Sequence, residues 1–164
     1  MVLQIIAKLT RGETILPADS TKDKRIDIDS ESDMVDAENI ENNASTQHLE
    51  APVNVIYQTA EDGLGDTIKP RLLAAGADCT KVMVIDDSEQ PLTMADVRLE
   101  EAIVQTKARM VVLDPIQGFL GSEVDMHRAN EIRPLMKRIA VLAEKYHCAI
   151  ILIGHMNKNS NGKS

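Results

Sequence analysis

The sequence predicts an α/β fold of three layers, in which a mostly parallel sheet lies between two layers of helices. Three short strand-like segments, at residues 55–60, 110–113 and 149–154, are largely apolar and are too short for helices. Such runs are typical of strands that are buried on both faces of a parallel sheet. Segments with helical periodicity separate them, and this alternation of strands and helices favours the three-layer arrangement.

The chain is predicted to begin with a helix, an acidic insert and a strand. In residues 2–9, Leu3, Ile6 and Ala7 share one helical face. The helix should end near Arg11-Gly12, because a basic residue followed by Gly is the usual order at a helix C-terminus. Residues 18–51 are polar, acidic and rich in Ser and Asn, and we expect them to form a disordered insert. The first strand of the sheet should then cover residues 53–58.

A short helix and a second strand are expected next. Gly63 and Gly65 break the chain after the first strand, and Asp66 is predicted to cap a helix that runs through Ala75. Pro70 lies early in this helix, where its missing N–H costs little. Residues 81–85 form the next predicted strand, which ends at Asp86-Asp87.

The second half of the chain repeats the alternation of helix and strand. Residues 93–96 resemble a capping box that starts a helix through about Lys107, and a strand follows at residues 109–113. A loop at residues 118–124 leads to a helix from Asp125 to Tyr146, which we expect to bend near Arg133-Pro134. The last predicted strand covers residues 149–153.

Length and charge distribution restrict the class of protein. A chain of 164 residues suits a single domain with a real core, and the aromatic content of 2% means that aliphatic residues and Met build that core. Of the net charge of −8, residues 18–51 carry −7, since they hold ten acidic and three basic residues. The rest of the chain carries −1, so the acidic total is no evidence against a nucleic-acid partner.

Two further observations indicate a cytoplasmic protein that does not bind membranes. Cys79 and Cys148 lie far apart, outside any spacing typical of metal ligands, which fits a reduced compartment. No apolar run approaches the roughly 20 residues that cross a bilayer.

A polar residue follows each of the three main strand-like segments. Glu61-Asp62 follows the first, Asp114 the second and His155 the third. Ligands of parallel α/β sheets bind beyond the carboxyl ends of the strands, so these side chains are predicted to share a site. Asp114 after an apolar strand has the form of a Walker B aspartate, which holds Mg²⁺ through water. Glu61 is suited to polarise an attacking water, and His155 to sense a γ-phosphate.

The three segments resemble a known family in sequence and in order. VIYQTAEDG at residues 55–63, LDPIQ at 113–117 and IGHMNK at 153–158 are similar to motifs of the RecA-like ATPases of plasmid and phage replication. The resemblance covers residues 53–158 and is closest to the hexameric replicative helicases of the plasmid RepA type, within the AAA-type ATPases. It implies a RecA-like P-loop NTPase fold, ATP and Mg²⁺ as cofactors, and a hexameric assembly.

The resemblance also implies roles for individual residues. Glu61 matches the catalytic glutamate, Asp114 the Walker B aspartate and His155 the phosphate-sensing residue. Asp62 and Gln117 are predicted to support nucleotide binding next to them. The loops at residues 118–125 and 156–164 match loops that face single-stranded DNA in such motors, and Lys158 and Lys163 are the weak candidates for phosphate contacts.

One family element has no match in the sequence. The family has a glycine-rich Walker A loop before its first helix, and nothing of this kind precedes Val2. Gly162-Lys163-Ser164 does not qualify, because position 157 is Asn157 rather than Gly. Residues 2–7 resemble the helix that follows Walker A. We therefore expect residues 1–164 to be one partial RecA-like domain without the Walker A strand and the C-terminal strands, and to hydrolyse ATP negligibly alone.

Two alternatives stay open at this point. A RecA-like domain that has lost nucleotide binding and serves as an assembly module would carry the same motifs. A phospho-receiver domain would explain Asp86-Asp87 and Asp114 on successive strands. However, only 27 positions separate Asp87 from Asp114, too few for the helix, strand and helix that a receiver requires.

Overall fold

The computed structural model describes residues 1–15, 51–126 and 128–154, and these residues form a parallel sheet with helices on both faces. The strands are β1 (Val55–Thr59), β2 (Val82–Met83), β3 (Met110–Asp114) and β4 (Ala149–Leu152), in the spatial order β2-β1-β3-β4. Every pairing is parallel. The predicted α/β fold with a parallel sheet is therefore confirmed. Strands β2 and β4 are the outer strands of the described sheet, and β4 pairs with β3.

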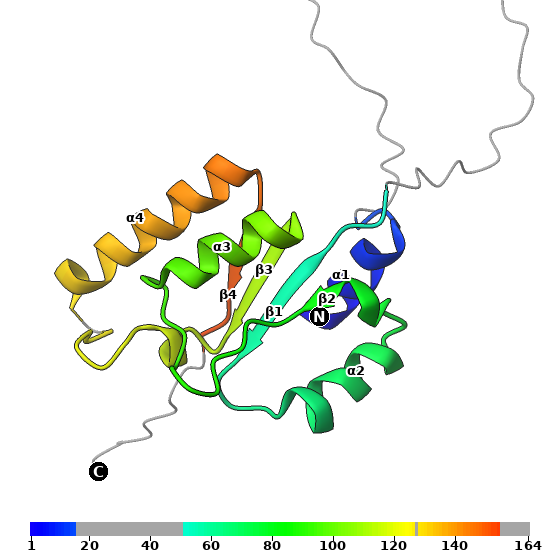
Figure 1. Ribbon diagram of the computed structural model, residues 1–164, viewed down its shortest axis with the longest axis horizontal. Helices are drawn as coiled ribbons and strands as arrows, with labels where there is room; N and C mark the ends of the chain where they lie inside the picture. Colours follow the sequence, from blue (N-terminus) through cyan, green and yellow to red (C-terminus); the bar gives the residue numbers. More distant parts are fainter. Residues whose placement is uncertain (16–50, 127, 155–164) are drawn as a thin grey trace, which may run out of the picture.

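Helices cover both faces of this sheet, as Figure 1 shows. Helices α1 (Val2–Arg11) and α2 (Lys69–Ala74) lie on one face, and α3 (Val97–Thr106) and α4 (Ala129–Tyr146) on the other. Each face has its own apolar cluster. The first cluster is centred on Ile6, Tyr57, Leu72 and Val112, and the second on Ile56, Leu99, Val111 and Leu142.

The alternation of side chains along the strands explains these two clusters. Successive residues of a strand point to opposite faces, so a strand buried on both faces needs apolar residues throughout. In β3, Met110 and Val112 join the cluster beneath α1 and α2, while Val111 and Leu113 join the cluster beneath α3 and α4. Asp114, the next residue, lies on the face covered by α1 and α2, where the first cluster ends.

Helix α1 ends as the sequence predicts. Gly12 adopts a left-handed conformation (φ 73°), and its N–H donates to the carbonyl of Leu9.

In contrast, three predicted helix starts are wrong. Leu64–Ile68 form a π-helical turn that begins after Gly63 and contains Asp66, so Asp66 is not the cap of α2.

The starts of α3 and α4 also differ from the prediction. Asp96 itself caps α3, because its carboxylate accepts a hydrogen bond from the N–H of Arg98 (2.9 Å), whereas Thr93 lies outside the helix. Helix α4 begins at Ala129 rather than Asp125 and continues through Pro134. Among the described residues, no helix has the length and apolar character needed to cross a bilayer. The predicted acidic insert at residues 18–51 lies almost entirely outside the described residues.

Strand β2 is much shorter than predicted, and the side chain of Gln58 explains how the sheet continues beyond it. Backbone pairing with β1 stops at Met83. The Gln58 side chain, which is fully buried, then takes its place: Oε1 accepts from the N–H of Ile85 (3.0 Å) and Nε2 donates to the Ile85 carbonyl (3.1 Å). Nε2 also donates to Oδ2 of Asp87 (2.9 Å). One amide thus anchors the segment after β2 to β1.

Replacing Gln58 with Leu should destabilise the fold by about 2 kcal/mol, because the change removes three hydrogen bonds and leaves the backbone groups of Ile85 without their partner. Equilibrium urea unfolding measures this change. The control is Gln105→Leu, the same substitution at an exposed position of α3, which should leave the free energy of unfolding within about 0.5 kcal/mol of the original. Equal effects of the two variants would contradict the anchoring role.

Candidate functional site

The predicted site lies where β1 and β3 end side by side. The two strands pair in parallel over five positions, from Val55 opposite Met110 to Thr59 opposite Asp114. Their carboxyl ends therefore meet at the same edge of the sheet (Figure 1). Glu61 and Asp62 follow β1 within three residues, and both are exposed there. The structure thus brings Glu61, Asp62 and Asp114 to one edge, as the sequence predicts.

The turn that carries Glu61 is held by backbone and side-chain hydrogen bonds. The N–H of Ala60 donates to the carbonyl oxygen of Asp114 (3.0 Å) and extends the strand pairing by one step. The hydroxyl of Thr59 accepts from the N–H of Glu61 (3.4 Å) and from that of Asp62 (3.1 Å). Threonine hydroxyls commonly stabilise turns in this way. The backbone of Glu61 is therefore fixed relative to β3.

Tyr57 orients the carboxylate of Asp114. Its hydroxyl donates to Oδ2 of Asp114 at 2.8 Å, and its side chain is only 2% exposed. Burial of the ring, and then the hydrogen bond to Asp114, raise the pKa of the phenol above its ordinary value. The hydroxyl consequently stays protonated at neutral pH and acts as a donor to the carboxylate.

The sequence alone does not single out Tyr57, although its pattern contains a signal for it. Residues 57 and 59 point to the same face of β1, and the strand pairing places them opposite Val112 and Asp114. A tyrosine is long enough to reach a diagonal neighbour on the adjacent strand. Finding this contact from sequence requires the register of β1 against β3, which the apolar pattern alone does not give.

Asp62 makes an ion pair with α2. Oδ2 of Asp62 lies 3.1 Å from a guanidinium nitrogen of Arg71, and both side chains are exposed, at 43% and 59%. The pair brings a cation that the sequence analysis did not single out to the border of the site. Exposed pairs of this kind contribute little to stability, about 0–1 kcal/mol, so Arg71 can exchange this carboxylate for another anion at small cost.

The turn after β3 contributes Gln117 to the same edge. Residues Ile116–Phe119 form a 3₁₀ helix directly after Asp114-Pro115. The N–H of Ile116 donates to the carbonyl of Ile153 (2.7 Å), which ties this turn to the end of β4. Gln117 is half-buried within it. His155, Lys158 and Lys163 lie outside the described residues, so their predicted roles stay predictions.

Helix α1 points its N-terminus toward this edge of the sheet. The carbonyl of Leu9, near the helix C-terminus, accepts a hydrogen bond from the N–H of Val53, just before β1 begins. The ten-residue helix then lies along the sheet with its first residue toward the carboxyl ends of the strands (Figure 1). Helix N-termini carry unpaired N–H groups and a partial positive charge, which favour bound phosphate.

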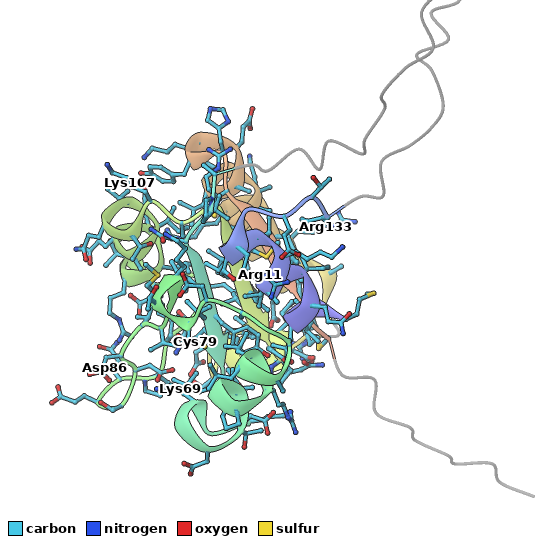
Figure 2. All side chains as sticks on the ribbon, turned by 90° about the vertical axis from the view of Figure 1, so that its right-hand side faces the viewer. Arg11, Lys69, Cys79, Asp86, Lys107 and Arg133 are labelled. Carbon is cyan, nitrogen blue, oxygen red and sulfur yellow. The ribbon has the colours of Figure 1, made fainter. Side chains whose placement is uncertain are left out.

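A separate pocket of about 440 Å³ lies between α2 and β2. Its lining is mostly apolar and includes Leu72, Val82 and one side of Tyr57. Lys69 and Cys79, both labelled in Figure 2, also line this pocket. Tyr57 therefore links the pocket to the candidate site through its hydrogen bond to Asp114.

The donor groups at the edge fit Mg²⁺ held through water better than a metal bound by protein ligands. In the part of the chain that the structure describes, no three His, Cys, Asp or Glu side chains form a metal-binding group. Mg²⁺ commonly keeps several waters and takes one or two carboxylates together with substrate phosphates. A single oriented carboxylate at Asp114 is consistent with that mode of binding.

Comparison with known proteins identifies the family. The model of the AAA domain family matches residues 37–161, which is more than half of the chain and includes β1, β3 and β4 with the residues that follow them. No curated protein matches the sequence. The four-stranded parallel sheet with helices on both faces is consistent with a RecA-like core. The chain therefore belongs to the AAA domain family, whose members are ATPases of the P-loop type.

Proposed function

We propose that, in the complete gene product, this domain contributes the carboxyl edge of β1 and β3 to the hydrolysis of Mg-ATP. One observation carries the proposal: the hydrogen bond from the N–H of Ala60 to the carbonyl of Asp114 joins the turn of Glu61 to the strand that ends in Asp114. The backbones of the residue that would orient the water and of the residue that would anchor the metal are thereby held next to each other. Nucleotide hydrolysis depends mainly on such positioning and on electrostatic stabilisation.

Asp114 would hold the water shell of Mg²⁺, which supplies the charge that neutralises the phosphates. The hydrogen bond from Tyr57 restricts rotation of the Asp114 carboxylate. Because Tyr57 is a neutral donor, it fixes the carboxylate without neutralising its charge. The negative charge therefore remains for the metal.

Glu61 would orient the attacking water. Its side chain is exposed at the edge, while its backbone is held through Thr59 and Ala60. A rigid backbone with an accessible carboxylate suits a residue that must meet a water molecule and a phosphate together. The N-terminus of α1 and the guanidinium of Arg71 lie toward the same edge and are suited to the negative charge of the triphosphate.

The more specific part of the proposal is a role in DNA replication, as a hexameric helicase of the RepA type in the cytoplasm. The motif order Glu61, Asp114 and His155 supports this, together with Lys158 and Lys163 in the segment that would face single-stranded DNA. Asp62 and Gln117 would support the bound nucleotide from the two turns that flank the site.

Replacing Glu61 with Gln should abolish ATP hydrolysis and preserve nucleotide binding. The test uses the complete gene product. We expect turnover of at least about 1 s⁻¹ for the unmodified protein and a loss of at least ~100-fold for Glu61→Gln. Binding of a fluorescent ATP analogue should be nearly unchanged.

The control for this experiment is Glu101→Gln, on the exposed side of α3, which should hydrolyse ATP normally. If the unmodified gene product binds no ATP and hydrolyses none, with or without single-stranded DNA, the domain is a non-catalytic assembly module. Hydrolysis that requires no DNA and is not stimulated by it would exclude the helicase role and retain the ATPase.

Replacing Tyr57 with Phe should lower kcat about tenfold and raise the Mg²⁺ concentration that gives half-maximal activity. The lost hydrogen bond to a carboxylate is worth about 1.5–3 kcal/mol, and the Asp114 carboxylate loses the hydroxyl that orients it. The matched control is Tyr146→Phe, which removes the hydroxyl that donates to Glu100 on the other face of the sheet (2.6 Å). An equal Mg²⁺ dependence in both variants would show that Tyr57 does not act through Asp114.

A further inference from the structure

Gly118 and Ala60 are in unusually close contact between the two turns of the site. A Cβ atom built on Gly118 would lie 2.3 Å from Cβ of Ala60 and 3.8 Å from its Cα. Carbon atoms in contact are normally separated by about 3.5–4.0 Å. The 3₁₀ turn after β3 therefore lies against the turn of Glu61 only because residue 118 has no side chain.

Neither turn can move away without losing hydrogen bonds. Ala60 donates its N–H to Asp114, and its Cβ is attached directly to the backbone. On the other side, the N–H of Gly118 donates to the carbonyl of Pro115 (3.0 Å), and the carbonyl of Phe119 accepts from the N–H of Met94 (2.8 Å). The short distance is thus imposed from both sides.

We propose that Gly118 is a positioning residue, whose missing side chain sets the separation between the Glu61 turn and Asp114. It acts through Ala60 and does not touch the nucleotide. The inference rests on the proposed ATPase function, since it concerns the geometry of the same site. A methyl group at position 118 would push the Glu61 turn away from β3 and shift the carboxylate that orients the water.

Backbone conformation does not explain this glycine. Gly121, three residues later, has a φ of 88°, a value that favours glycine wherever it occurs, and a Cβ there would have its nearest neighbour at 3.7 Å. The φ of Gly118 is not in that left-handed range. Other residues can adopt the backbone conformation of Gly118. The space beside Ala60 is therefore the only constraint that requires glycine here.

The experiment compares Gly118→Ala, Ala60→Gly and the double variant in the complete gene product. We expect Gly118→Ala to lower kcat at least tenfold with little change in KM, because a misplacement of about 1 Å can cost ~100-fold in rate. Ala60→Gly removes the methyl group that Gly118→Ala would meet. The double variant should therefore recover to within about threefold of Ala60→Gly alone.

Gly65→Ala is the control, because a Cβ at Gly65 has no neighbour within 4 Å. It should hydrolyse ATP normally. Unchanged kcat in Gly118→Ala, or a double variant no better than Gly118→Ala, would overturn the proposal. The rescue also separates positioning from general destabilisation, since adding a second substitution to a merely unstable protein would not restore its activity.

A second measurement does not depend on the ATPase function. In the 164-residue chain, Gly118→Ala should shift the backbone amide resonances of Glu61 and Asp62, and the double variant should return them toward those of Ala60→Gly. If the gene product lacks ATPase activity but these shifts occur, the packing inference holds and the proposed function fails. If activity is present but the shifts are absent, the positioning role of Gly118 is refuted.

Discussion

The parallel pairing of β1 with β3 is the interaction on which the rest of the structure depends. Its register runs from Val55 opposite Met110 to Thr59 opposite Asp114 and is continued by the N–H of Ala60. A shift by one residue would turn every side chain of one strand to the opposite face. Both apolar clusters would then be lost, and Asp114 would no longer meet Tyr57. The apolar core and the site are therefore specified by the same register.

Backbone hydrogen bonds and neighbouring side chains together position Glu61 and Asp114. Asp114 is held by the ladder and oriented by Tyr57, while Glu61 is held through Thr59 and Ala60. Glu61 is exposed, whereas Asp114 is half-buried. Two residues of similar chemistry thus stand in different surroundings. This difference suits one carboxylate that meets a mobile water and another that anchors a metal ion.

The sequence predicts the strands of this fold better than its helix starts. Short, mainly apolar runs locate β1, β3 and β4, because burial on both faces of the sheet favours apolar residues. Strand β2 ends early because the Gln58 side chain takes over its pairing, an interaction between residues 27 positions apart. Asp66, Thr93 and Asp125 all have the chemistry of helix caps, but local sequence does not show which of several suitable residues begins the helix.

For the candidate site, the sequence predicts which residues lie at the sheet edge and misses the side chains that contact them. The placement of Glu61, Asp62 and Asp114 at one edge could be predicted because parallel strands end at the same edge. Tyr57 and Arg71 depend on strand register and on the placement of α2. Gly118 looks like any loop glycine in the sequence, and only the distance to Ala60 distinguishes it.

The composition of β4 has a consequence for the protein before it reaches its folded state. Residues Ala149–Leu152 carry no charge and no proline, and in the described part of the chain only β3 pairs with them. Such an edge accepts any extended segment that offers matching N–H and carbonyl groups. Off-pathway association between partly folded chains therefore competes with folding, and it rises with concentration. The yield of native protein consequently depends on how quickly this edge is covered and on how dilute the protein is.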